Sequence, residues 1–221
     1  AALTRPLQES GADLHLIELD RDLVSRLEQK FSDNDNVTIH SCDALKVNLE
    51  EITGGRPSRL IGNLPYNIST PLIFHVLKWH HLIVDMHFML QREVVERMAA
   101  SPGGRTFGRL SVMTQFRCKV TPLFDVPPES FSPAPRVHSS IVRLTPLQQP
   151  PADAGSFESL QKVVTAAFSM RRKTLRNSLK KYFTAEQMIG LGIDPGQRAE
   201  QLDLSQFAAL ARSLHNDADC N

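Results

Sequence analysis

The stretch Arg59-Leu60-Ile61-Gly62-Asn63-Leu64-Pro65-Tyr66 decides how the rest of the chain is interpreted. Residues 59–62 form a short, mainly apolar run typical of a buried strand, and a carboxamide, a proline and an aromatic ring follow close behind it. Because Leu64 precedes a proline, its backbone is biased toward an extended conformation that can turn its carbonyl oxygen outward. The stretch therefore predicts a strand ending in a restrained corner, residues 63–66.

The side chains of this corner suit the binding of a flat base that carries an amino group. The exocyclic nitrogen of adenine is a poor nucleophile because its lone pair is delocalised into the ring. The Asn63 side-chain oxygen and the Leu64 carbonyl can each accept one amino hydrogen, which favours a tetrahedral nitrogen with an available lone pair. The Tyr66 ring can stack on the base, a contact worth about 1–3 kcal/mol in nucleic-acid-binding proteins. Asn63, Leu64, Pro65 and Tyr66 are the predicted catalytic residues; the alternative is a strand followed by an ordinary Asn-Pro turn.

Strand and helix patterns alternate on both sides of the corner. The predicted strands are residues 13–20, 37–40, 59–61 and 86–90, and the predicted helices that alternate with them are residues 23–27, 71–80 and 91–99. This alternation predicts an α/β fold with a parallel, doubly wound, Rossmann-like sheet. Ligands of such sheets bind at the carboxyl ends of the strands.

Polar side chains stand at three of those strand ends. Glu18 closes the first strand, where a carboxylate can accept hydrogen bonds from ribose hydroxyls. Asp43, with Ala44 beside it, follows the second strand and can accept from the amino group of a cofactor adenine, and Asn63 follows the third. Each acid alone is more often a helix cap or a turn residue. Together with Asn63, they are predicted to converge on one crevice.

A proline-rich stretch, residues 126–139, precedes an alternating strand at residues 139–144. Its one aromatic residue is Phe131. We predict that this loop presents Phe131 over the mouth of the site, opposite Tyr66, so that an extruded base is held between two rings. The alternative is a rigid loop in which Phe131 is a hydrophobic plug.

The chain changes character at the Pro/Gln-rich residues 145–154, which suggest a domain boundary. The predicted domains are residues 1–147, of the α/β class, and residues 148–221, a small all-helical domain. The latter carries a basic segment, predicted to be helical with an apolar stripe at Leu175 and Leu179. Its cations are Arg171, Arg172, Lys173, Arg176, Lys180 and Lys181. The whole chain has a formal net charge of only +1, so this local concentration suits RNA phosphate contacts, although a solvated face is the commoner role of such a run.

Other bulk features exclude several classes of protein. No apolar run is long enough to span a bilayer and no signal peptide is recognisable. The three cysteines are scattered, which favours a reducing compartment, and we expect a cytoplasmic protein. His75, His80, His81 and His87 have no metal-binding spacing, so no metal is expected.

Residues 63–66 are the Asn-Leu-Pro-Tyr form of the amino-methyltransferase signature. With the following Asn67-Ile68-Ser69-Thr70-Pro71-Leu72, they resemble the KsgA/RsmA-type ribosomal RNA small-subunit adenine dimethyltransferases. The resemblance runs from residue 1 to about residue 214 and includes Glu18, Asp43, the Phe131 loop and the segment from Arg171 to Lys173.

The resemblance implies an S-adenosylmethionine-dependent methyltransferase fold with a small helical domain. It implies N6,N6-dimethylation of two adjacent adenosines in a small-subunit rRNA hairpin near the 3' end, as part of ribosome biogenesis. Glu18, Asp43, Ala44 and Asn63 match the residues that hold S-adenosylmethionine. The implied partner is rRNA within an immature ribosomal subunit, and we expect a monomer.

The sequence departs from the family in one respect. The glycine-rich loop that contacts the methionine part of the cofactor is not found, and Gly190-x-Gly192 has the wrong spacing and no preceding strand. We therefore expect these residues alone to bind the cofactor weakly and to be inactive. Two alternatives remain: a large-subunit rRNA adenine methyltransferase of the macrolide-resistance type, and a non-catalytic factor that binds RNA during small-subunit assembly. A DNA adenine methyltransferase is disfavoured because such enzymes generally have Pro-Pro in the signature.

Overall fold

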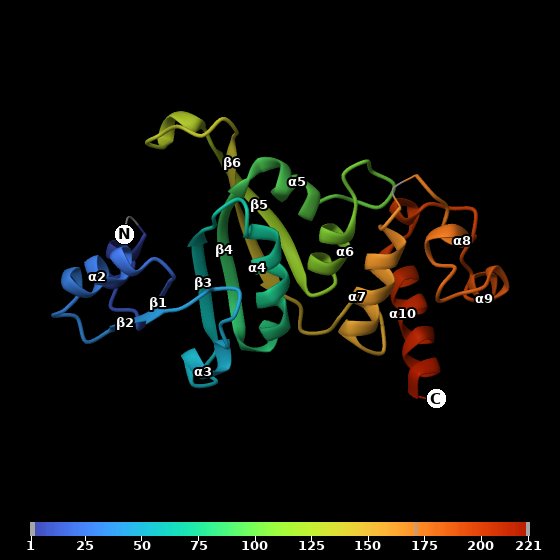
Figure 1. The fold of residues 1–221 in the computed structure, drawn as a ribbon, viewed down its shortest axis with the longest axis horizontal. Helices are drawn as coiled ribbons and strands as arrows, with labels where there is room; N and C mark the ends of the chain where they lie inside the picture. Colours follow the sequence, from blue (N-terminus) through green and yellow to red (C-terminus); the bar gives the residue numbers. More distant parts are fainter. Residues whose placement is uncertain (1–2, 171, 220–221) are drawn as a thin grey trace.

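The computed structural model describes residues 3–170 and 172–219, and Figure 1 shows the described chain as an elongated row of sheets and helices with the two termini at opposite ends. The strands are β1 (Leu14–Glu18), β2 (Val37–Ser41), β3 (Ser58–Asn63), β4 (Ile83–Gln91), β5 (Cys118–Val126) and β6 (Ser139–Pro146). Every strand predicted from the sequence is present within one to three residues at each end.

Helices connect and cover these strands. They are α1 (Thr4–Glu9), α2 (Arg21–Lys30), α3 (Leu49–Thr53), α4 (Ser69–Val76), α5 (Arg92–Met98), α6 (Arg109–Gln115), α7 (Phe157–Ala167), α8 (Leu175–Ser178), α9 (Ala185–Gly190) and α10 (Leu204–Asp219), with 3-10 helices η1 (Leu77–Leu82), η2 (Pro128–Ser130) and η3 (Ala199–Gln201). Local signals set several of the ends. The Asp20 carboxylate caps α2 by accepting from the backbone N–H groups of Asp22 and Leu23, and Gly54 ends α3 with a φ of 61°.

The strands form a mixed α/β arrangement, as the Rossmann-like prediction requires. β1 pairs with β2 and β3 pairs with β4 in parallel, whereas β6 runs antiparallel to both β4 and β5. One detail of the prediction was wrong, because the strands do not make a single sheet. They form a two-stranded sheet, β1-β2, and a four-stranded sheet, β3-β4-β6-β5.

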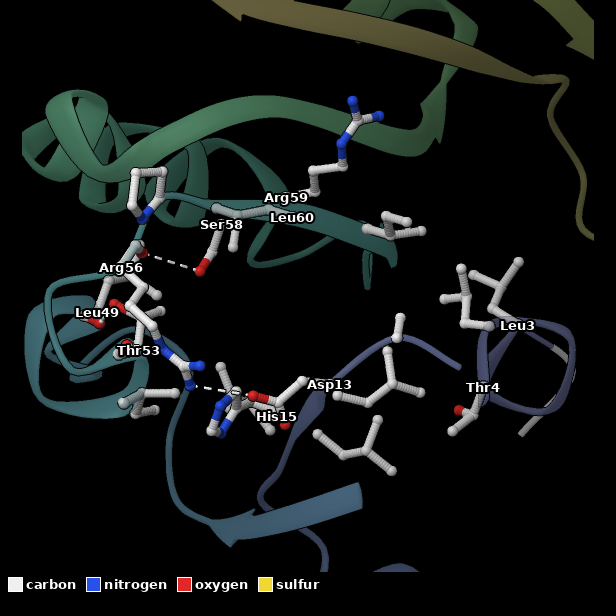
Figure 2. A pocket seen from close by; sticks show the side chains of 18 residues that line it. Leu3, Thr4, Asp13, His15, Leu49, Thr53, Arg56, Ser58, Arg59 and Leu60 are labelled. Carbon is white, nitrogen blue, oxygen red and sulfur yellow. Dashed lines mark hydrogen bonds and ion pairs between the residues drawn. The ribbon is translucent and has the colours of Figure 1, made fainter. Parts of the chain in front are cut away.

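The break lies between β1 and β3, whose backbones do not pair. Two cavities of about 450 Å³ and 300 Å³ occupy this space, and both are lined by residues of β1 and β3, including Leu16 and Leu60. Figure 2 shows the larger one, where an exposed ion pair, 3.0 Å between Arg56 Nη2 and Asp13 Oδ2, bridges toward β1. The two sheets are therefore joined by partly buried residues such as Ile17 and Leu45, with cavities between β1 and β3.

The buried apolar residues form two clusters. One lies against the four-stranded sheet and includes Met86, Leu90 and Leu144, and the other fills the helical part between α7, α8 and α10. Helix α6 joins them, because its Leu110 belongs to the sheet cluster and its Met113 to the helical cluster. The sheet and the helical part are thus connected through a continuous apolar interior.

The basic segment differs from its prediction. Helix α8 is a single turn, whereas we expected a helix that carried all the cations through Lys181. The backbone N–H groups of Leu175 and Arg176 donate to the carbonyls of Gln197 and Pro195, so the segment is held to a neighbouring loop instead of continuing as a helix. Leu175 and Leu179 are fully buried, as the apolar stripe predicted. Within residues 3–170 and 172–219, no helix is both long enough and apolar enough to cross a membrane.

Candidate active site

Residues 63–66 begin in β3 and end just before α4. The Leu64 N–H donates to the Met89 carbonyl at 3.2 Å, which continues the pairing with β4 one residue beyond Asn63. The side chain of Leu64 is buried and lies against Gly62, because a Cβ added to Gly62 would come 3.0 Å from Leu64 Cδ2. Asn63 and Tyr66 are exposed. The corner thus combines a fixed backbone with side chains that are open to a ligand.

Two hydroxyl groups hold the far end of the corner. The Ser69 hydroxyl, on a buried side chain, donates to the Tyr66 carbonyl at 3.1 Å. The Tyr66 hydroxyl lies 2.9 Å from the hydroxyl of Ser139 at the start of β6, and either can donate. Ile68 N–H also donates to the Pro65 carbonyl. The turn and the tyrosine ring are therefore both fixed by groups outside the signature.

Glu18 lies at the carboxyl end of β1, as predicted. One of its carboxylate oxygens accepts from the backbone N–H groups of Leu19 and Asp20, at 2.8 and 3.0 Å. These two bonds orient the side chain and leave its second oxygen available to a ligand. The Glu18 carbonyl accepts from Cys42 N–H, which holds the two strand ends together.

Asp43 follows β2 directly. Its Oδ1 accepts from Leu45 N–H at 2.9 Å, which fixes the carboxylate in a local turn and leaves Oδ2 free to accept. Glu18 and Asp43 are brought to the same edge of the two-stranded sheet, whereas Asn63 belongs to the other sheet. Ala44 and Leu64, from the two sides, line the 300 Å³ cavity between the sheets. The convergence of all three polar groups stays a prediction.

Phe131 is half-buried and follows the short helix η2 in the arm between β5 and β6, which projects from the sheet in Figure 1. The arm leads directly into Ser139, the partner of Tyr66. Its approach to an extruded base stays a prediction.

The predicted RNA-binding cations are all exposed where the structure describes them: Arg172, Lys173, Arg176, Lys180 and Lys181. Arg171 lies outside the described residues. Exposed guanidinium and ammonium groups can contact phosphate without a large desolvation cost.

An arginine cleft, which the sequence did not reveal, extends this basic surface. Its volume is about 1040 Å³, and five arginines and two glutamates contribute to its lining. The arginines are Arg97, Arg105, Arg109, Arg172 and Arg198, which come from α5, the loop before α6, α6 itself and two turns of the helical part. No sequence signal could have found them together, because they are spread over about 100 positions.

Arg109 is the least exposed cation of the arginine cleft. Its guanidinium lies over the Phe74 ring, 4.8 Å from the centroid. Its Nε is buried and has no hydrogen-bond partner within the described residues. Such a guanidinium retains donors for an anionic ligand.

The remaining titratable groups point to no other chemistry. Burial raises the pKa of the Cys118 thiol to about 12, so this cysteine is not a nucleophile at neutral pH. Among the residues that the structure describes, no three His, Cys, Asp or Glu side chains are grouped so as to hold a metal ion.

Comparisons with known proteins identify the family of the chain. The family model described as "Ribosomal RNA adenine dimethylase" matches residues 1–216. Proteins named "Ribosomal RNA small subunit methyltransferase A" from Yersinia pestis (strain Pestoides F) and Yersinia pseudotuberculosis serotype O:1b are each 50% identical over 215 residues, covering 96% of this chain and 79% of theirs.

Solved structures show the same fold. A dimethyladenosine transferase from Plasmodium falciparum aligns with a TM-score of 0.72 at 25% identity, over 92% of this chain and 82% of that one. The 23S rRNA methyltransferase ErmE aligns with a TM-score of 0.68 at 22% identity, over 96% and 86% of the two chains, and supports the fold alone. On the strength of its family match and its relatives, the chain belongs to the ribosomal RNA adenine dimethylases, which are S-adenosylmethionine-dependent methyltransferases.

Proposed function

We propose that this protein dimethylates the exocyclic amines of two adjacent adenosines in a hairpin loop near the 3' end of small-subunit rRNA, during assembly of the subunit in the cytoplasm. The observation that carries the proposal is the fixed corner at residues 63–66, in a chain 50% identical to small-subunit methyltransferases. The substrate in this proposal is rRNA within an immature small subunit, and the protein acts as a monomer without a metal.

The corner positions the reacting amine. Its backbone is held by β4 on one side and by Ser69 on the other, so the Leu64 carbonyl needs little reorganisation to accept one amino hydrogen, and the exposed Asn63 side chain can accept the other. Two acceptors localise the nitrogen lone pair, and Tyr66 and Phe131 hold the base plane. Catalysis of this kind is mainly positioning and electrostatics. The surplus proton leaves the amine for water after transfer.

The residues around the two-stranded sheet fit a nucleoside cofactor. The second oxygen of Glu18 can accept from ribose hydroxyls, and Oδ2 of Asp43 can accept from an adenine amino group, with Ala44 lining the adjacent cavity. S-adenosylmethionine, bound here, would supply an electrophilic methyl group.

The helical part supplies RNA affinity. The exposed cations at residues 172, 173, 176, 180 and 181 and the arginine cleft come from several elements, so phosphates of more than one strand can be contacted. Such contacts give affinity and strong salt dependence, and they position the RNA without reading its sequence.

A second candidate function is that of a non-catalytic assembly factor. The arginine cleft and the exposed cations of the helical part favour it, because an RNA-docking surface would serve this role without any methyl transfer. Both functions share the RNA-docking step and differ in the transfer of methyl groups.

The test compares the unmodified protein with Asn63→Ala on small subunits that lack the modification. We expect methyl incorporation from labelled S-adenosylmethionine to fall by about 100-fold or more, as when one polar group is removed from a preorganised site. Subunit binding should remain within about twofold of that of the unmodified protein, because rRNA affinity comes mainly from phosphate contacts. Absence of incorporation by the unmodified protein, with retained binding, would favour the assembly role.

A further inference from the structure

Ser139 is a fully buried hydroxyl side chain at the entrance of β6, 73 positions away from Tyr66 in the sequence. Its backbone pairs with Gln91 of β4 and with Val126 of β5. The preceding carbonyl, of His138, accepts from Arg92 N–H at 3.0 Å. The strands on both sides of Ser139 therefore hold its backbone, independently of the contact with Tyr66.

The side chain of Ser139 is directed by the strand in which it lies. Val142 and Leu144, at even positions of β6, are buried in the sheet core, and alternation along the strand places Ser139 on the opposite face. On that face its hydroxyl meets the Tyr66 hydroxyl at 2.9 Å. A buried serine hydroxyl that lost this partner would be left unsatisfied, so the bond is favoured whenever the ring adopts this position.

Tyr66 needs such a partner because its ring is otherwise little constrained. The residue is 38% exposed, and the other bond at this residue, from Ser69, reaches only its carbonyl. Without the Ser139 bond, the backbone would be fixed while the ring could turn about its side-chain bonds. A ring that stacks on a base must be held in one plane, and ordering it beforehand lowers the entropic cost of binding.

We propose that Ser139 is a positioning residue that holds the Tyr66 ring in the plane on which the target adenine stacks. It also connects that ring to the arm that carries Phe131, because the arm ends at Ser139. This inference rests on the proposed function, in which Tyr66 stacks on the base. Ser139 does not touch the substrate; it acts through the tyrosine.

The experiment uses immature small subunits in which 2-aminopurine replaces the target adenosine, and it measures the subnanosecond fluorescence-lifetime component that appears on addition of the protein, when this base stacks on it. The readout requires neither cofactor nor methyl transfer. The variants are Ser139→Ala, Tyr66→Phe, the double variant and Tyr66→Ala. The matched control is Ser140→Ala, since Ser140 is also buried and adjacent, but its hydroxyl donates to the Phe124 carbonyl instead.

We expect Tyr66→Ala to lower the component more than any other variant, with the remainder coming from Phe131. Loss of one neutral hydrogen bond corresponds to a decrease of about threefold to tenfold, so Ser139→Ala and Tyr66→Phe should each lower the stacking equilibrium by that factor. The double variant should be no worse than either single variant, because both remove the same bond. Ser140→Ala should match the unmodified protein.

Different outcomes test the positioning role of Ser139 and the stacking role of Tyr66 separately. An unchanged component in both Ser139→Ala and Tyr66→Phe, with loss in Tyr66→Ala, would overturn the positioning role and leave stacking by Tyr66 intact. An unchanged component in Tyr66→Ala would overturn the stacking role itself. Loss in Ser139→Ala but not in Tyr66→Phe would show that the serine acts through the fold, and additive losses in the double variant would likewise contradict a shared bond.

Discussion

The four-stranded sheet has two neighbours, and it is joined to them in different ways. Toward the helical part, the joint is a continuous apolar interior through α6, and Arg117 bridges it, with Nη1 2.8 Å from His80 Nε2 and its guanidinium 4.4 Å from the Phe157 ring centroid. Toward the two-stranded sheet, the joint contains two cavities, an exposed ion pair and partly buried residues such as Ile17 and Leu45.

The candidate sites lie on different sides of this difference. The corner at residues 63–66 and the basic surface, proposed to bind the base and the RNA, lie on the well-packed side, which is joined by a continuous apolar interior. Glu18 and Asp43 lie on the side with the hollow, where no residue of β1 or β2 is fully buried. We expect the packed joint to tolerate substitution poorly and the hollow joint to tolerate it well.

The largest expected difference is between core substitutions on the two sides. Met113→Ala removes a buried side chain from the helical cluster and should lower the free energy of unfolding by about 2–5 kcal/mol. Leu16→Ala, in half-buried β1 beside the cavities, should cost less than about 1.5 kcal/mol, because less area is buried. Urea denaturation measures both, and equal losses would contradict the proposed difference between the joints.

Asp43→Asn tests the cofactor side directly. A hydrogen bond to a charged group contributes about 1.5–3 kcal/mol, so affinity for S-adenosylmethionine should fall by roughly tenfold to 100-fold in calorimetric titration. Asp20→Asn is the control, since it removes the same charge from the loop after β1 but retains a good cap for α2. An equal loss in the control would assign the effect to net charge.

The stability of the protein should depend modestly on pH through His80, which lies at the packed joint. Burial, with Arg117 and His81 nearby, holds the pKa of His80 below its usual 6.5. The unfolded chain then binds more protons than the folded one, so stability should decrease as the pH falls from about 6.5 toward the lowered pKa, and level off below it.

His80→Gln should flatten this dependence, because glutamine can accept from Arg117 without titrating. The comparison is His40→Gln on the hollow side, since burial and His15 also lower the pKa of His40. Thermal unfolding from about pH 5 to about pH 8, the range in which histidines titrate, measures the stability of both variants. If stability depends on pH in the same way in His80→Gln as in the unmodified protein, His80 is not the cause of that dependence.

The smallest effect is expected at the ion pair of the hollow joint. Arg56 and Asp13 are 68% and 54% exposed, so Asp13→Asn should change stability by less than about 1 kcal/mol. High salt should abolish that change, because exposed pairs are screened. A larger loss that persists in high salt would mean that this pair holds the two sheets together.

Local sequence patterns were enough to predict the order of the elements and the position of the corner. Hydrophobic runs and turn residues are local signals, so the strand at residues 59–61 and the helix after Pro71 were predicted correctly. The fold class followed from their alternation, and the family followed from residues 63–72.

Features that join residues far apart in the chain became visible only in the folded protein. The arginine cleft, the bond between Tyr66 and Ser139, and the sharing of α6 between two cores each join segments separated by tens of residues. The split between β1 and β3, and the reduction of the basic helix to one turn, also depend on neighbouring segments. Local patterns specify which residues prefer strand or helix, but pairing and burial depend on the partners that the folded chain brings together.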